Sequence, residues 1–183
     1  MFTTPWIIYQ KYQPNSKIFP VLKSNAYGHG IKQVAKILKN QNLDFVCVDS
    51  YYEYLKIKDI IDCKTLIIGY TKPQNYKLFN FKKISITIYD LDTIKILEQI
   101  NQTINIHLKI DTGMNRQGVQ FSELSNILEK LKGCNNIILE GVFSHLADAD
   151  NPFNDQYTEN QVYLFKKALK LIKNKGFNPK YIH

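Results

Sequence analysis

The sequence predicts an α/β fold in which parallel strands alternate with helices, as in a (β/α)8 TIM-type barrel. Short apolar runs rich in β-branched residues alternate with amphipathic stretches along all 183 residues. Strands that are apolar throughout are typical of a parallel sheet covered by helices. No Ser/Gly-rich linker and no low-complexity tract interrupts the alternation, so we expect a single domain, residues 1–183.

The apolar runs define the expected strands in chain order. These are residues 18–22, 44–48, 65–69, 84–88, 104–110, 137–143 and 180–182. A complete barrel has eight strands and typically about 250 residues, so we expect an incomplete barrel with about seven strands. The alternative is a doubly wound sheet. It is disfavoured in its dinucleotide-binding form, because no Gly-x-Gly-x-x-Gly motif follows the first strand.

The stretches between the strands have helical periodicity, with apolar residues recurring every three or four positions. The apolar faces expected for three helices consist of Ile31, Val34, Ala35 and Leu38, of Leu91, Ile94, Ile96 and Leu97, and of Val162, Phe165, Leu169 and Ile172. Asp90 is expected to cap the second of these helices. Gly176 is expected to end the third.

The composition disfavours several classes of protein. The formal net charge is +8, but Arg116 is the only arginine, and proteins that bind nucleic acids favour arginine for bidentate contacts. The lysines are spread along the expected helices, so we interpret them as a solvated surface and expect no nucleic-acid partner. The apolar runs have strand length, so no membrane span is expected.

The cysteines and the start of the chain indicate a cytoplasmic protein. Cys47, Cys63 and Cys134 are odd in number and have no paired spacing, so we expect reduced thiols, without a disulfide framework or a metal site. Residues 1–10 lack the basic and long apolar regions of a secretory signal.

Side chains that could take part in binding or catalysis fall directly after the expected strands. Lys23 follows the first, Lys109 and Arg116 lie at and after the fifth, His145 follows the sixth and His183 the seventh. In a (β/α)8 barrel all these positions belong to the C-terminal face, where active sites are built.

The stretch around Lys23 is the most informative. Residues 19–30 read Phe-Pro-Val-Leu-Lys-Ser-Asn-Ala-Tyr-Gly-His-Gly. A lysine at the end of an apolar strand lies at the rim of a low-dielectric interior, which favours the neutral amine that a Schiff base requires. A lysine extending from a strand end into solvent is the structural alternative. Gly28 and Gly30 allow backbone to approach a ligand, and Tyr27 adds a hydroxyl.

Three motifs, in the same order, resemble those of alanine racemases. Residues 19–30 are similar to the family's cofactor-lysine motif, with Ser24 in place of Ala. Residues 108–118, Leu-Lys-Ile-Asp-Thr-Gly-Met-Asn-Arg-Gln-Gly, resemble its Lys-x-Asp-Thr-Gly-Met-x-Arg-x-Gly segment. Residues 140–150, Glu-Gly-Val-Phe-Ser-His-Leu-Ala-Asp-Ala-Asp, resemble its Gly-x-x-x-His-x-Ala-x-Ala-Asp segment. The resemblance covers nearly the whole chain.

The resemblance implies roles for five residues. Lys23 would form the Schiff base with pyridoxal 5'-phosphate and later act as the catalytic base on the D-alanine side. Tyr27 would bind the cofactor phosphate, and His145 would belong to the polar network beside the pyridine ring. Arg116 would bind the cofactor phenolic oxygen and the substrate carboxylate. Lys109 matches a lysine often carried as a carbamate; without that modification or an intervening water it would repel Arg116.

The resemblance also implies the reaction, interconversion of L- and D-alanine for peptidoglycan synthesis, and a homodimer in the full-length protein. His183 matches the first residue of a His-x-x-Asn-Ser phosphate motif, so we expect the later phosphate loops and the C-terminal β domain to be absent. That domain carries the second base, so we expect little activity from this chain alone. A non-racemising barrel that binds pyridoxal phosphate for cofactor homeostasis remains the alternative, and serine or broader specificity stays open.

Overall fold

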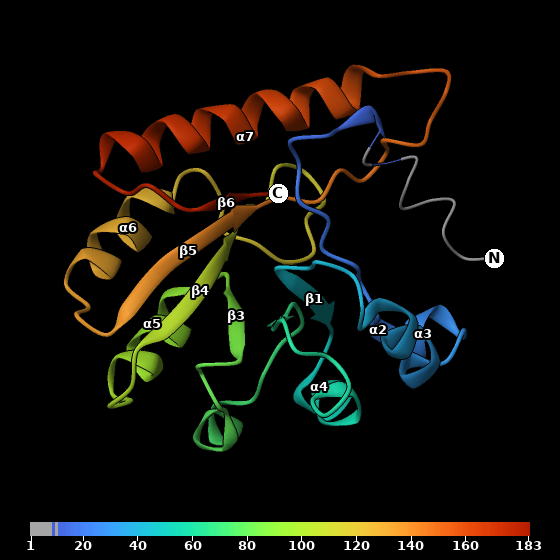
Figure 1. Ribbon diagram of the computed structural model, residues 1–183. Coiled ribbons are helices and arrows are strands. Elements are labelled where there is room, and N and C mark those ends of the chain that lie inside the picture. The colour runs from blue at the N-terminus through green and yellow to red at the C-terminus, as the bar shows by residue number, and fades with distance from the viewer. Residues whose placement is uncertain (1–8, 10) are drawn as a thin grey trace. The chain divides into compact units, whose positions relative to one another are not determined.

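A computed structural model describes Tyr9 and residues 11–183. The chain forms two compact units, Met1–Leu66 and Ile67–His183. Both units contain strands that alternate with helices, and Figure 1 shows the elements in their order along the chain.

From Lys23 onward, the first unit contains helices and the first strands of the sheet. Its elements are α2 (Lys23–Tyr27), α3 (Ile31–Leu38), β1 (Phe45–Val48) and α4 (Tyr51–Ile57), and β2 (Lys64–Ile67) starts in this unit beside β1. All four residues of β1 are buried. On α3, Ile31 and Ala35 of the predicted apolar face are buried.

The expected strand at residues 18–22 is not formed as a strand. Val21 makes an isolated parallel bridge with Cys47, in which the Leu22 N–H donates to the Cys47 carbonyl and the Cys47 N–H to the Pro20 carbonyl, both at 2.7 Å. Pro20 has no N–H to extend the ladder, and the chain enters α2 at Lys23. The prediction was therefore right about the pairing direction and wrong about the length.

The second unit is built on four parallel strands in sequential order, β3 (Ile84–Ile88), β4 (Ile104–Lys109), β5 (Ile137–Phe143) and β6 (Tyr181–Ile182). Every residue of β3 is buried. The strands at 84–88 and 137–143 agree with the predicted bounds, whereas β4 ends one residue early, at Lys109. A register shift between Ile106 and His107 interrupts the β4–β5 ladder.

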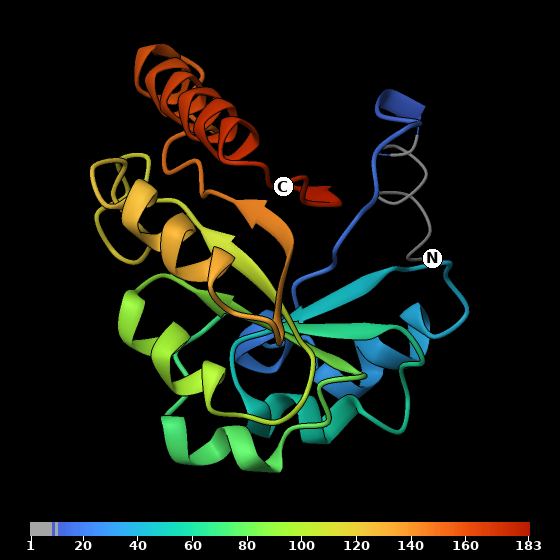
Figure 2. The same cartoon turned by 90° about the vertical axis from the view of Figure 1, so that its left-hand side faces the viewer.

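Helices alternate with these strands along the chain and cover them from outside. They are the 3-10 helix η1 (Pro73–Leu78) and the α-helices α5 (Leu91–Glu98), α6 (Leu124–Lys132) and α7 (Gln156–Asn174). Figures 1 and 2 show α5, α6 and α7 following one another along the same side of β3–β6. This arrangement buries Ile94 and Leu97 of α5 and Ile172 of α7.

The predicted ends of two helices are confirmed. The Asp90 side chain accepts a 2.6 Å hydrogen bond from the Thr93 N–H and so caps α5. After α7, Gly176 has φ +85° and its N–H donates to the Lys173 carbonyl, which is the left-handed closure expected of glycine.

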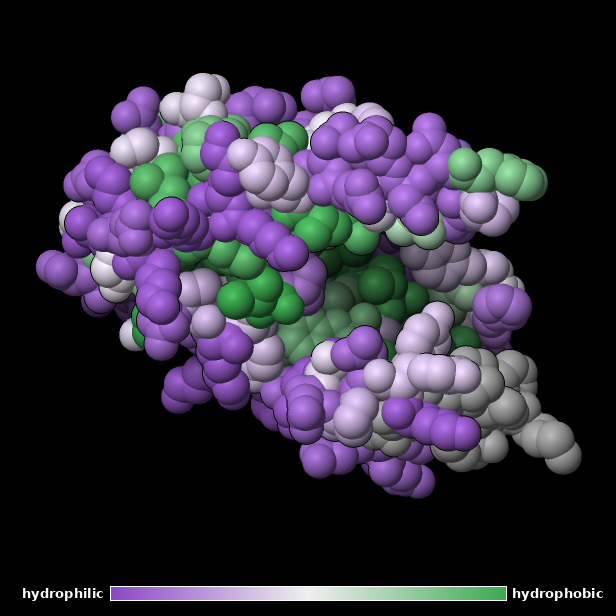
Figure 3. All heavy atoms as spheres, turned by 90° about the horizontal axis from the view of Figure 1, so that it is seen from above, coloured by the Kyte–Doolittle hydropathy of each residue, from purple (hydrophilic) through white to green (hydrophobic). Residues whose placement is uncertain are grey.

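The lysine-rich helix α7 presents a hydrophilic face. Its exposed residues include Lys166, Lys167, Lys170 and Lys173. Figure 3, viewed from the side on which α7 lies, shows mainly hydrophilic atoms over this helix with apolar atoms between them. Across the described residues, no helix is long and apolar enough to cross a membrane.

Candidate functional site

The loop that carries Lys23 is a turn of left-handed helix. Ser24, Asn25, Ala26 and Tyr27 all have positive φ, between 52° and 56°. Left-handed helix places each Cβ close to the following carbonyl oxygen and costs roughly 1–2 kcal/mol per residue. Such backbone strain persists only where surrounding contacts impose it, and it clusters at functional sites.

Hydrogen bonds on both sides of the turn hold this conformation. Inside it, the Gly30 N–H donates to the Asn25 carbonyl at 2.9 Å, and Asn25 Oδ1 accepts from the Ile31 N–H at 2.9 Å, which ties the turn to the start of α3. From α4, the Glu53 carboxylate accepts from the backbone N–H groups of Ser24 and Asp49, each at 2.8 Å. Glu53 therefore fixes the backbone next to Lys23.

The turn brings Lys23 and Tyr27 together. Lys23 is half-buried and its Nζ lies 5.9 Å from the centroid of the Tyr27 ring, while Tyr27 itself is 61% exposed. A Cβ at Gly28, the next residue, would meet no atom within 4 Å. An amine and a phenol thus share one open loop.

In the second unit, the register of the strands aligns the ends of β4, β5 and β6. Lys109 pairs with Phe143, and Val142 pairs with Ile182. Lys109 is 6% exposed, and its Nζ lies 5.9 Å from the centroid of the Phe143 ring. The predicted placement of Lys109 at the carboxyl end of a buried strand is observed.

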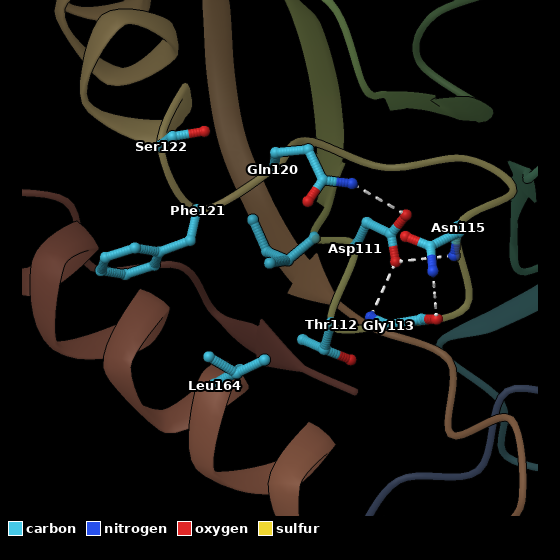
Figure 4. A pocket seen from close by; sticks show the side chains of 9 residues that line it. Asp111, Thr112, Gly113, Asn115, Gln120, Phe121, Ser122 and Leu164 are labelled. Atoms are coloured by element: carbon cyan, nitrogen blue, oxygen red, sulfur yellow. Dashed lines mark hydrogen bonds between the residues drawn. The ribbon is translucent and has the colours of Figure 1, made fainter. Parts of the chain in front are cut away.

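Arg116 lies on an exposed part of the loop after β4, and Asp111 organises that loop. Asp111 Oδ1 accepts from the N–H groups of Gly113 and Asn115 at 2.9 and 3.1 Å, and Oδ2 accepts from Gln120 Nε2 at 3.1 Å. Figure 4 shows these bonds converging on the carboxylate. At Gly118, a Cβ would lie 2.6 Å from the Asp111 backbone nitrogen, so the loop closes only with glycine there.

The same loop lines a pocket of about 340 Å³. Its polar side is formed by Asp111, Thr112 and Asn115, and Phe121 and Leu164 lie across from them (Figure 4). The oxygens of the Asp111 carboxylate are bonded to groups of its own loop. We therefore interpret the pocket as a result of the loop's conformation and not as a ligand site.

His145 is exposed in the loop after β5, and a buried side chain of α7 connects this loop to the preceding one. Gln161 is 1% exposed; its Oε1 accepts from the Ala147 N–H at 2.8 Å and its Nε2 donates to the His145 carbonyl at 2.9 Å. Gln161 Nε2 also lies 3.3 Å from Thr112 Oγ1 in the loop after β4. The loops that carry Arg116 and His145 therefore share one buried amide.

His183, which directly follows β6, forms a pair with His107, which lies within β4. His107 Nδ1 and His183 Nε2 are 2.8 Å apart, and the His183 ring stacks on Phe143 with centroids 4.7 Å apart. Burial of the ring and the nearby His107 lower the pKa of His183 to about 3. On its other side, His107 Nε2 lies 3.6 Å from Glu140 Oε2, which also accepts from Ser85 Oγ at 2.7 Å.

The cysteines carry no sign of a metal centre or a disulfide. Cys47, Cys63 and Cys134 are free thiols. Burial, together with nearby Cys63, raises the pKa of Cys47 to about 12, which keeps it an unreactive thiol. Among the described residues, no group of three or more His, Cys, Asp and Glu side chains could hold a metal ion.

Two residues that position the loops were missed by the sequence interpretation. Gln161 begins a buried stripe on α7 that continues through Ala168 and Ile172, but the predicted apolar face started at Val162. A glutamine in phase with such a stripe is the signal that could have found it. Glu53 gave no comparable signal, because its partners are backbone groups of distant residues.

Comparison with known proteins identifies the family. Residues 7–183 match the model of the alanine racemase N-terminal domain. The chain belongs to the alanine racemase N-terminal domain family. The alanine racemase of Carboxydothermus hydrogenoformans is 36% identical over 173 residues, which are 92% of this chain and 46% of that protein. The chain thus spans about half the length of the curated relatives it matches.

Solved structures confirm the predicted fold. Alanine racemase from Clostridium difficile in complex with cycloserine has a TM-score of 0.84 at 32% identity, covering 91% of this chain and 47% of that one. The Bacillus anthracis enzyme with bound L-Ala-P has a TM-score of 0.87 at 28% identity, covering 97% and 47%. The chain is therefore part of an α/β (β/α)8 TIM-type barrel.

Proposed function

We propose that this chain forms the cofactor-binding barrel part of a pyridoxal-phosphate-dependent alanine racemase, which interconverts L- and D-alanine and supplies D-alanine for peptidoglycan. The observation that carries the proposal is the left-handed turn that joins Lys23 to Tyr27, because backbone strain is maintained there around an amine and a phenol. Family membership and relatives named alanine racemases support the same reaction.

The residues of the first unit fit pyridoxal phosphate by the chemistry of their donors. The cofactor has an aldehyde, which a primary amine can hold covalently, and a phosphate, which hydroxyl and backbone N–H groups can bind. Lys23 offers the amine and Tyr27 the hydroxyl on one turn. The open space beside Gly28 lets a ligand approach this backbone.

The residues would divide the work as follows. Pyridoxal phosphate, when bound, supplies an electron sink that acidifies the α-proton of the substrate. Lys23 holds the cofactor and, once its amine is released, accepts or returns that proton at Nζ on the D-alanine side. The planar guanidinium of Arg116 binds the carboxylate of alanine and the phenolic oxygen of the cofactor. His145 joins the polar groups beside the cofactor ring.

Lys109 is buried, with 6% of its surface exposed, and it matches a lysine that alanine racemases often carry as a carbamate. We propose that its amine is carbamylated. The carbamate would be an anion able to orient the Arg116 guanidinium, whereas an ammonium would repel it. A high-resolution density map with a bare ammonium in direct contact with the guanidinium would contradict this.

Racemisation needs a proton acceptor on each face of the substrate carbanion, and Lys23 serves one face. We propose that a tyrosine of a partner subunit supplies the second base in a cytoplasmic homodimer of the full-length protein. This chain alone would then turn over alanine roughly 10²–10⁴-fold more slowly than a complete racemase.

The test combines cofactor binding with proton exchange. On titration with pyridoxal phosphate, the wild type and the K32A variant, which lacks an exposed lysine of α3, should develop the absorption of lysine-bound cofactor, and K23A should not. Loaded protein in D₂O should then exchange the α-proton of alanine, followed by NMR. Cofactor binding without exchange would contradict the racemase proposal and favour a cofactor-carrying barrel. Faster exchange of the α-proton of serine than of alanine would indicate that serine is the substrate.

A further inference from the structure

Gln161 occupies an unusual place for a polar side chain. It lies on the buried stripe of α7 with 1% of its surface exposed, in line with Ala168 and Ile172. A buried carboxamide costs free energy unless its donors and acceptor are paired. Here Oε1 accepts one hydrogen bond and Nε2 has two partners, from three different residues of the loops after β4 and β5.

The partners fix the orientation of the amide and the direction of the whole chain of hydrogen bonds. The Ala147 N–H needs an acceptor and the His145 carbonyl needs a donor, so Oε1 faces Ala147 and Nε2 faces His145. The second Nε2 hydrogen then points at Thr112 Oγ1.

The hydroxyl groups continue this direction. Ser144 Oγ donates to the Ile110 carbonyl at 2.9 Å, so Thr112 must be the donor in the 2.7 Å contact between the two hydroxyls. Thr112 Oγ1 is then left to accept from Gln161. Each group in the chain Gln161–Thr112–Ser144–Ile110 donates to the next, and reversal at one link would leave a donor facing a donor.

A second contact from α7 reaches the same loop. Tyr157, one turn before Gln161, donates its hydroxyl to the Gly113 carbonyl at 2.7 Å. The hydroxyl of Tyr157 is bonded to the loop after β4, whereas the amide of Gln161 is bonded to both loops. The two residues therefore make separable contributions.

We infer that Gln161 is a positioning residue that couples the loop bearing Arg116 to the loop bearing His145, so that neither loop shifts without the other. In the proposed racemase, on which the functional meaning of this coupling rests, it would keep the substrate-binding guanidinium and the imidazole in a fixed relation. The coupling itself is a property of the backbone of the two loops and is measurable without cofactor.

The experiment is amide hydrogen exchange in the intact chain. Q161M replaces the amide with an apolar group of similar length, and Q156M makes the same change at an exposed position of the same helix. Q161M should raise exchange about tenfold or more in both residues 112–118 and residues 144–149, without a change at β3. Y157F should raise it only in the first segment, and Q156M in neither. A change in one loop alone for Q161M would overturn the coupling.

A double-variant cycle separates positioning from simple structural support. T112V removes one partner of Gln161. As a single variant it should raise exchange at the Ala147 N–H several-fold, and when added to Q161M it should have no further effect. Additive effects, or an unchanged Ala147 amide in T112V, would overturn the proposal. T112V also removes the hydrogen bond from Thr112 to Ser144, so S144A, which removes that bond and keeps Thr112 as a partner of Gln161, is its matched control. A smaller rise at the Ala147 N–H in S144A than in T112V supports the coupling, and an equal rise overturns it, even if Q161M destabilises the whole unit.

Discussion

The loop of Lys23 and the loops of Arg116 and His145 are held in place by different means. The first is a strained left-handed turn whose hydrogen bonds are mostly local, with one half-buried carboxylate, Glu53, added from α4. The second pair is held by buried side chains, Asp111 within one loop and Gln161 between the two.

The difference matches what each loop is proposed to do. A lysine that exchanges between cofactor and free amine needs a turn with a defined backbone and an accessible side chain, and strain at the backbone provides this while Tyr27 remains exposed. Groups that only bind and orient gain from a buried, fully paired network, which is rigid but intolerant of substitution. The second unit should therefore lose more stability than the first when a polar anchor is removed.

The largest effect is expected at Asp111. D111A leaves three donors of its loop without their acceptor, and hydrogen bonds to charged groups contribute about 1.5–3 kcal/mol each, so the free energy of unfolding should fall by about 3 kcal/mol after partial compensation by water. D111N should cost only about 1 kcal/mol, because Oδ1 remains and the Gln120 amide can turn its oxygen toward the new N–H. Urea denaturation measures both, and equal losses would contradict the account.

A smaller effect concerns pH and the pair of His183 with His107. The pKa of His183 is lowered to about 3 in the folded protein, below its ordinary value of 6.5. The unfolded chain therefore binds a proton that the folded chain does not between these values, and stability falls as pH is lowered through that range. A single proton limits the loss to about 1.4 kcal/mol per pH unit, and because His183 retains contact with solvent at the edge of the unit, the loss should stay below that limit.

Comparison with a variant isolates this contribution. H183Q should show a shallower loss of stability with acid than the wild type, and H29Q, altered at an exposed histidine of the first unit, should keep the wild-type slope. Urea midpoints measured between pH values of about 4 and 7 give the slopes. A wild-type slope in H183Q would show that other groups account for the dependence.

At Glu53 we expect a loss of about 1 kcal/mol in E53Q, since the amide keeps one acceptor where the carboxylate had two. Exchange at the Ser24 N–H should increase about fivefold, and the fall in the urea midpoint should be about a third of that in D111A. A fall in global stability as large as that of D111A would remove the proposed contrast between the two regions.

The smallest effect is a gain. Ser24 is exposed with φ +52°, so glycine relieves left-handed strain, and S24G should raise the free energy of unfolding by about 0.5 kcal/mol after the entropic cost of glycine. K32G, at an exposed position of the right-handed helix α3, should lower it by about 1 kcal/mol. Thermal unfolding of both variants distinguishes the signs, and a loss in S24G would show that the turn is not strained.

Much of the fold could be predicted because the strands of a parallel sheet covered by helices are rich in apolar residues, and such runs can be recognised in the sequence. β3 and β5 were predicted to the residue, because both are rich in isoleucine, valine and other apolar residues although they include Ser85, Thr87 and Glu140. The left-handed turn could not be predicted, since Ser24, Asn25 and Ala26 are compatible with ordinary helix and their conformation depends on contacts made by Glu53. Periodicity reports which residues are apolar, so it passed over Gln161, whose burial depends on partners in distant loops.

The central claim is that Lys23 is the residue that holds pyridoxal phosphate. Reduction of the cofactor-loaded chain with borohydride, followed by proteolysis and peptide mass mapping, records the attachment site directly. We expect a single labelled peptide that contains Lys23, and loss of that label in K23R with no other lysine taking its place. Label on Lys109 or on a surface lysine, with Lys23 unmodified, would contradict it.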